Sequence, residues 1–162
     1  MGFSSATNTL VSNLNGQKQI EHLFTLLKKI GLFSMLCTAL MAIAALLIPK
    51  LMLGIFTDEE ELILATLPSL KVILGSLMMY SVVSILLSAV SGTGKTMLSL
   101  IIEFLTILFY LYATYLAAVK WEMSIEWVWG VEYVYFTFLG ALSLFFLFRI
   151  KSDLQKSYEL TA

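Results

Sequence analysis

Cysteine and charged residues are scarce in this sequence of 162 residues. The one cysteine, Cys37, leaves no pair for an intrachain disulfide, and a lone cysteine gives no metal-ligand spacing. Charged residues make up 13% of the chain, whereas a soluble domain carries about 25%. So few cannot cover the outer faces of a soluble helical bundle, which excludes that class. The net charge of −1 also argues against a nucleic-acid partner.

Signatures of catalysis are missing as well. The sequence contains no paired acids, no metal-ligand cluster and no nucleophile–base set of the Ser/His/Asp or Cys/His kind. We therefore expect that the protein is not an enzyme and that it binds no cofactor and no metal.

The N-terminus does not resemble a secretory signal, because residues 1–15 lack a basic segment and a long apolar core. We expect these small, polar residues to be the end of a helix whose beginning is missing. Ser4, Asn8, Ser12 and Asn15 recur along one face of that helix. Asn8 is therefore a candidate for lining a cavity.

Hydrophobic residues, by contrast, make up 59% of the chain and gather in long runs. A membrane-spanning helix needs about 20 of them. Four segments reach that length: 30–56, 62–90, 97–119 and 127–150. The sequence therefore predicts an all-α fold, a polytopic membrane helical bundle. Its four full transmembrane helices are preceded by a partial helix and by a short amphipathic interfacial helix.

The amphipathic helix is predicted over residues 17–29, in the headgroup region. Apolar side chains recur there at the i, i+3, i+4 and i+7 spacing of a helical stripe, at Ile20, Leu23, Phe24 and Leu27. The only histidine, His22, lies in this segment. We interpret it as a solvated interfacial side chain, with a proton switch as the alternative.

Other connections also have the composition of a membrane interface. Thr57 and Glu60 have the spacing of a capping box at a helix start. Pro49 and Pro68 are expected to kink or start helices near the same membrane face. An aromatic belt is predicted between the third and fourth spans, at Trp121, Trp127 and Trp129.

Orientation follows from the basic residues, which concentrate in cytoplasmic loops. Because loops alternate sides, one side receives seven of the ten: Lys18, Lys28, Lys29, Lys95, Arg149, Lys151 and Lys156. The sequence therefore predicts that residues 17–29, the 91–96 loop and the C-terminal tail, 151–162, are cytoplasmic. The predicted location is the cell (inner) membrane, crossed several times.

The 91–96 loop, SGTGKT, contains a GKT triplet without the rest of a phosphate-binding P-loop. The first P-loop glycine would fall at Ala89, and the preceding segment is a membrane helix rather than a strand. We predict a tight glycine turn instead. Before it, Ser84, Ser88 and Gly92 form a small-residue face, expected to pack against another helix, with lining of a cavity as the alternative.

The third span carries a polar line of four side chains at i, i+3, i+7 and i+11, namely Glu103, Thr106, Tyr110 and Thr114. A carboxylate at the centre of a membrane helix costs roughly 2.5–3.5 kcal/mol, and less near the helix end. We therefore expect Glu103 to face other helices rather than lipid. The line is interpreted either as a proton- or cation-responsive acid in a cavity or as a structural hydrogen-bonding face. Glu132, closer to its helix end, is given the structural interpretation.

Three stretches of the chain resemble a known family. Residues 6–17, ATNTLVSNLNGQ, resemble the end of the second helix of a half in multidrug and toxic compound extrusion (MATE) transporters. Residues 87–96, LSAVSGTGKT, resemble the small-residue turn after the fourth helix of a half, and IIEF at 101–104 follows as in bacterial members. The order and spacing of these stretches extend the resemblance over nearly the whole chain.

The resemblance implies that residues 1–162 form one membrane domain, the end of helix eight followed by helices nine to twelve of two six-helix lobes. It implies an antiporter driven by Na⁺ or H⁺ that exports organic cations and drugs. The first lobe and helix seven are absent, and residues 62–90 contain no acid where some members carry one in helix ten. No family ion site can therefore be placed on this sequence.

The function predicted is that of a C-terminal fragment of a cation-coupled multidrug efflux antiporter that does not transport alone. The alternative is a small non-transporting membrane protein, such as a partner subunit, a scaffold or an inactive remnant. The lipid bilayer is the expected partner, joined in a complete transporter by Na⁺ or H⁺ and by organic cations or drugs. The candidate cavity-lining or coupling residues are Glu103, Thr106, Tyr110 and Asn8.

Overall fold

The computed structural model describes residues 2–55 and 59–159, and this part of the chain is helical and contains no strand. The elements in chain order are α1 (Gly2–Gly16), η1 (Ile20–His22), α2 (Leu23–Leu47), α3 (Pro49–Leu53), α4 (Glu60–Gly92), α5 (Thr96–Tyr115), η2 (Leu116–Lys120) and α6 (Ile125–Glu159). The short η1 is a 3₁₀ turn and η2 a π-helical turn that extends α5.

Four helices are long and apolar enough to cross a membrane: Ile20–Leu47, Glu60–Gly92, Thr96–Lys120 and Ile125–Tyr158. Large apolar side chains cover their outer surfaces, and Met41 and Leu47, for example, are each 76% exposed. Such surfaces are stable only against lipid or other apolar partners. The predicted helical bundle with four spans is therefore confirmed.

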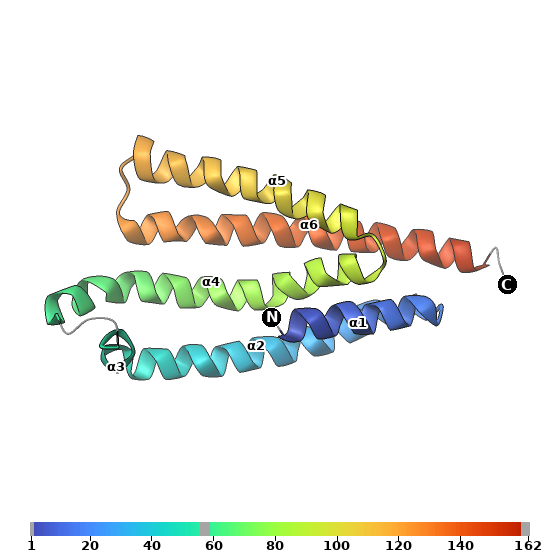
Figure 1. The fold of residues 1–162 in the computed structure, drawn as a ribbon, viewed down its shortest axis with the longest axis horizontal. Coiled ribbons are helices and arrows are strands. Elements are labelled where there is room, and N and C mark those ends of the chain that lie inside the picture. Colours follow the sequence, from blue (N-terminus) through green and yellow to red (C-terminus); the bar gives the residue numbers. More distant parts are fainter. Residues whose placement is uncertain (1, 56–58, 160–162) are drawn as a thin grey trace.

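The four long helices lie side by side in the order α2, α4, α6, α5, and α1 lies across α2 and α4 (Figure 1). The end of α1, the α4–α5 turn and the end of α6 gather at one end of the bundle (Figure 1). The α5–α6 connection and α3 lie at the other end. The described residues of the segments predicted to be cytoplasmic therefore share one end of the structure.

The first span starts and ends earlier than predicted. Helix α2 ends at Leu47, and Ile48 leaves helical geometry at φ −129° and ψ 49°. The cause is Pro49, whose ring disfavours the helical region for the residue before it; Pro49 itself starts α3.

At the N-terminal end of α2, residues 23–29 form the first two turns of the helix, so the predicted separate amphipathic helix is wrong. The apolar stripe itself is present, because Ile20, Leu23 and Leu27 are buried.

Two further helix ends differ from the sequence prediction. Helix α4 begins at Glu60, with Glu59 at the N-cap, so it does not start at the predicted capping box. Thr57, the first residue of that box, lies outside the described residues, and Glu60 accepts a hydrogen bond from Lys50 Nζ at 3.1 Å. Pro68 lies inside α4 rather than at its start. Helix α6 continues to Glu159, well past the predicted span end at position 150.

The extension of α6 is anchored to the N-terminal part of the chain. The Tyr158 hydroxyl lies 2.7 Å from Asn15 Oδ1 and 3.1 Å from the Asn15 carbonyl oxygen. Lys151 Nζ donates to the Glu21 carbonyl at 3.1 Å. A buried cluster formed by Leu23, Leu147 and their neighbours lies in the same region. The end of α6 therefore packs onto α1 and η1 instead of leaving the bundle as a separate tail.

Candidate functional site

The polar face of α1 packs against the end of α4. Asn8 Nδ2 donates to Ser91 Oγ at 3.3 Å, and Ser12 Oγ donates to the Gly92 carbonyl at 3.0 Å. Asn15 Nδ2 reaches the Thr93 carbonyl at 3.4 Å. Three of the four predicted polar positions thus satisfy groups at the start of the glycine turn. The structure places Asn8 at this helix contact.

Glycine is needed twice in the α4–α5 turn. A Cβ on Gly92 would lie 2.7 Å from the Asn8 carbonyl oxygen and 2.9 Å from Val11 Cβ, so only glycine allows α1 to approach this closely. Gly94 has φ +87°, a conformation that side chains disfavour. The structure therefore contains the predicted tight turn. At Gly92 the small-residue face packs against another helix, as the packing interpretation predicted.

The polar line of α5 runs along one margin of its contact with α6. Thr106 is fully buried, and its Oγ1 lies 2.9 Å from the carbonyl oxygens of both Ile102 and Glu103. The Tyr110 ring packs on the Tyr135 ring of α6, with centroids 5.2 Å apart. The side chain of Tyr135 also interacts with Thr106.

Glu103 does not pack among the described helices. Its side chain is exposed, although it lies close enough to Tyr135 for an electrostatic interaction. Buried positions on α5 are Ile102 and Thr106, and Glu103 projects to one side of them. The expectation that Glu103 faces other helices is therefore wrong within the described part of this chain. The reason is that α5 lies at the edge of the bundle, with only α6 and part of α4 beside it.

Glu132 on α6, unlike Glu103, does contact a neighbouring long helix. Its Oε2 lies 2.5 Å from the hydroxyl of Ser76 on α4, which is 1% exposed. One residue further along α6, the Tyr133 hydroxyl donates to the Val72 carbonyl at 3.0 Å. Gly75 leaves the space that the Tyr133 hydroxyl occupies, since a Cβ there would lie 1.9 Å from that oxygen. This polar contact between α4 and α6 was not predicted.

A chain of aromatic contacts connects Glu132 with the polar line of α5. Tyr80, one turn beyond Ser76, packs on Phe136 with centroids 5.5 Å apart, and Phe136 packs on Tyr135 at 5.0 Å. Tyr135 in turn contacts Tyr110. A continuous polar–aromatic strip therefore crosses α4, α6 and α5. We use this name for Ser76, Tyr80, Glu132, Phe136, Tyr135, Tyr110, Thr106 and Glu103.

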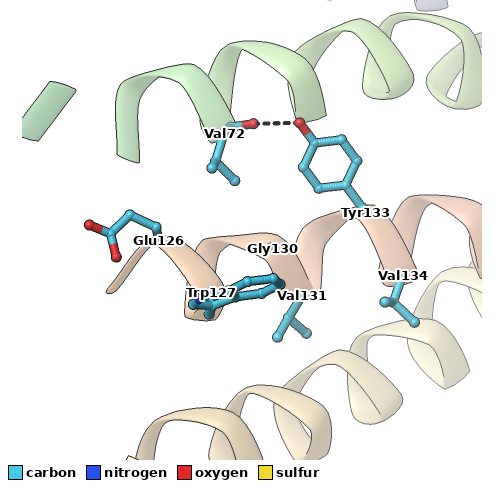
Figure 2. A pocket seen from close by; sticks show the side chains of 7 residues that line it. All are labelled: Val72, Glu126, Trp127, Gly130, Val131, Tyr133 and Val134. Atoms are coloured by element: carbon cyan, nitrogen blue, oxygen red, sulfur yellow. Dashed lines mark hydrogen bonds between the residues drawn. The ribbon is translucent and has the colours of Figure 1, made fainter. Parts of the chain in front are cut away.

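Several hollows are open along the helices, and two of them lie beside residues described above. One, of about 710 Å³, follows α6 near its start and is lined by Val72, Glu126, Trp127, Gly130, Val131, Tyr133 and Val134. Figure 2 shows Tyr133 directed to α4, while Trp127, Val131 and Val134 project from another side of α6. The other, of about 440 Å³, lies between α1, α2 and α4 and includes Ser4, Tyr80 and Ser84. Both linings are mostly apolar, which suits lipid tails or apolar molecules better than ions.

The described residues contain no group of three or more His, Cys, Asp or Glu side chains placed to hold a metal ion. The strip supplies hydroxyl groups, aromatic faces and two separated carboxyl groups. This chemistry suits hydrogen bonding and proton binding rather than bond cleavage.

Comparison with known proteins places the chain in a family. The MatE family model matches residues 1–116, more than half of the chain. Over 106 residues the chain is 29% identical to a protein described as probable multidrug resistance protein NorM from Thermotoga maritima. That match covers 65% of this chain but only 23% of the relative, so the chain spans less than a quarter of its length. No solved structure matches. The chain belongs to the MatE family of multidrug and toxic compound extrusion transporters.

Proposed function

We propose that this chain forms the C-terminal part of a cation-coupled multidrug efflux antiporter, driven by Na⁺ or H⁺, that exports organic cations or drugs. The match of the MatE family model over residues 1–116 carries the proposal. The description of the relative as a probable multidrug resistance protein supports the direction of transport and the substrate class. The four apolar spans supply the membrane domain that such transport needs.

The proposed place in the transporter is the end of helix eight, as α1, followed by helices nine to twelve, as α2, α4, α5 and α6. Helix α1 (Gly2–Gly16) packs its polar face against the end of α4. It lies along only part of the bundle, next to the ends of α4 and α6 (Figure 1). In this proposal Glu103, Thr106, Tyr110 and Asn8 line a cavity or take part in coupling.

The proposed orientation has the end of the bundle that carries Lys95 in the cytoplasm. Labelling of single cysteines tests it in whole cells that express a variant without Cys37. A cysteine at Asp58 should react with an impermeant maleimide added outside, and a cysteine at Lys95 should not. The reverse pattern would refute the orientation.

Transport by this chain alone is not expected, because alternating access generally needs two repeats or bundles that move about a central site. The test uses proteoliposomes containing the chain, a fluorescent organic cation and an imposed Na⁺ or H⁺ gradient. No gradient-driven flux above protein-free vesicles is expected, and robust flux would refute the proposal. An upstream coding segment in the same reading frame would support a longer transporter, whereas its absence would favour the small non-transporting membrane protein.

A further inference from the structure

The uncharged runs of α2 and α6 end at the same level of the bundle. Residues 30–47 of α2 and residues 133–148 of α6 contain no charged side chain. Close to the ends of these runs the Phe24 ring stacks on the Phe148 ring, with centroids 4.4 Å apart. Basic residues that flank an apolar span place their charges at the depth of the lipid headgroups. The Phe24–Phe148 pair therefore lies where the apolar part of the bundle ends.

Two lysines from distant parts of the sequence lie beside this pair of rings. Lys151 Nζ lies 5.3 Å from the centroid of the Phe24 ring. Lys28 is one turn beyond Phe24 on the same side of α2, and its side chain is exposed. We propose that Lys28 and Lys151 bind the phosphate group of an anionic phospholipid beside the Phe24–Phe148 pair.

Basic side chains outnumber acids at this level. The charged residues within five positions of Phe24 or Phe148 are Lys28, Lys29, Arg149 and Lys151 against Glu21 and Asp153, together with His22. None of the four lysine and arginine residues forms an ion pair with a described residue, whereas Glu21 Oε1 lies 3.4 Å from His22 Nε2. The positive excess favours a lipid with a net negative charge, because the ammonium group of a zwitterionic lipid offsets its own phosphate.

Lys151 is held in position without a ligand. Its Nζ donates to the Glu21 carbonyl at 3.1 Å, which uses one of the three donors of an ammonium group. The other two can point to a phosphate oxygen. Because the side chain is already ordered, less conformational entropy is lost when the phosphate binds.

The surface below the two lysines suits acyl chains. Leu32 is one turn from Lys28 toward the middle of α2 and is 60% exposed. On α6, Phe145 and Phe148 are 58% and 61% exposed. A lipid held by its phosphate would cover these side chains with its tails, whereas a free phosphate ion would leave them uncovered. The lipid is therefore the favoured source of the phosphate.

On the other side of Lys151, away from the apolar runs, the structure leaves room for a headgroup. A hollow of about 160 Å³ is lined by Lys18, Ile20, Glu21, Gln155 and Tyr158. Gln155 is one turn beyond Lys151 on α6. Amide, carboxyl and phenol groups can hydrogen-bond the hydroxyls of a glycerol headgroup. Phosphatidylglycerol is therefore the probe for the experiment.

The opposite end of the bundle supplies matched controls. Lys50 is paired there with Glu60 at 3.1 Å. Lys71 and Lys120 share that end with several acids, namely Glu59, Glu61, Glu122 and Glu126. The three tryptophans, Trp121, Trp127 and Trp129, also belong to that end, at the α5–α6 connection (Figure 1). Their fluorescence reports on lipid far from the proposed site.

Fluorescence quenching by brominated lipids tests the site in phosphatidylcholine vesicles that contain the full chain. The reporter is Phe145→Trp, in a protein whose three native tryptophans are replaced by phenylalanine. Brominated phosphatidylglycerol should bind near this reporter about 5-fold more tightly than brominated phosphatidylcholine, since one lysine at a membrane surface supplies about that factor. Lys28→Gln and Lys151→Gln should each reduce the preference, and the double variant should abolish it. Lys71→Gln and Lys120→Gln should leave it unchanged.

The native tryptophans of the unmodified protein should show no such preference. Circular dichroism confirms that each variant folds, and Lys28→Gln decides the matter if Lys151→Gln does not fold, because Lys28 is exposed. Equal quenching by the two lipids, or a preference that persists in the folded double variant, would overturn the proposal. Equal binding of brominated phosphatidylethanolamine would also overturn it, and so would displacement of the lipid by inorganic phosphate at constant ionic strength. The inference does not depend on transport, because it concerns the folded chain in any bilayer.

Discussion

Gly75 offers the sharpest test of the contact between α4 and α6. An alanine Cβ at this position would lie 1.9 Å from the Tyr133 hydroxyl oxygen and 3.1 Å from its Cζ. The ring must therefore move, and its 3.0 Å hydrogen bond to the Val72 carbonyl is lost. Overpacking of a well-packed core costs about 1–3 kcal/mol, and a lost hydrogen bond about 0.5–1.5 kcal/mol. We expect Gly75→Ala to lower the free energy of unfolding by about 2–4 kcal/mol.

The assay is reversible unfolding of the chain in mixed micelles with increasing sodium dodecyl sulfate, followed by circular dichroism. Gly130→Ala is the matched control, because Gly130 lies on α6 near Tyr133 and a Cβ there meets nothing within 4 Å. It should be neutral or slightly stabilising, since alanine favours helix by up to about 1 kcal/mol.

A double-mutant cycle separates the steric clash from a general effect of the substitution. Tyr133→Phe removes the atom closest to the new Cβ and should cost about 1 kcal/mol by itself. If the clash is the cause, the Gly75→Ala/Tyr133→Phe double variant should be more stable than Gly75→Ala alone. Additive losses, or a Gly75→Ala protein as stable as the wild type, would refute the reasoning.

Three further predictions concern other contacts. Gly92→Ala should displace α1 from α4, because its Cβ would lie 2.7 Å from the Asn8 carbonyl oxygen, and should cost about 1–3 kcal/mol in the same unfolding assay. Tyr158→Phe removes the hydroxyl that contacts Asn15, so trypsin should cleave the end of α6 faster while the rest of the chain stays resistant. Glu103→Gln should leave the stability of this chain within about 0.5 kcal/mol, because the side chain is exposed; a loss above 2 kcal/mol would show that Glu103 supports the fold.

The spans were predictable because a bilayer demands long apolar runs, and no tertiary contact is needed to recognise them. The α4–α5 turn was predictable for a similar local reason, since Gly94 supplies a backbone conformation that other residues disfavour. Two of the errors at helix ends also have local causes. Pro49 interrupts the apolar segment 30–56, which the sequence predicts as one span. Ile150, Leu154 and Tyr158 continue the buried side of α6 at i, i+4 and i+8, a signal that the long apolar run before them obscured.

The contact between Ser76 and Glu132 was harder to predict because it depends on the register between two helices. A signal did exist in α4, where Ser69, Ser76, Tyr80 and Ser84 follow a spacing like that of the polar line in α5. That pattern shows which side of α4 is polar. It does not show which residue of α6 lies opposite Ser76, because that depends on how far the two helices are shifted and rotated against each other.

Glu103 and Glu132 each lie about two turns from the start of their helix, so the sequence pattern within each helix does not distinguish their environments. Their surroundings differ because α6 lies between α4 and α5, whereas α5 lies at the edge of the bundle (Figure 1). An acid on a central helix faces a neighbouring helix in most directions around the helix axis. An acid on an edge helix faces one in far fewer directions.

The Tyr110–Tyr135 contact shows how deep each acid lies along the bundle. Glu103 is seven residues from Tyr110 toward the α4–α5 turn, and Glu132 is three residues from Tyr135 in the opposite direction, so about 15 Å of helix rise separates them. The polar–aromatic strip thus has an acid at each end: Glu132 contacts a neighbouring helix, and Glu103 is exposed. This difference comes from the positions of the helices and not from the spacing of residues within them.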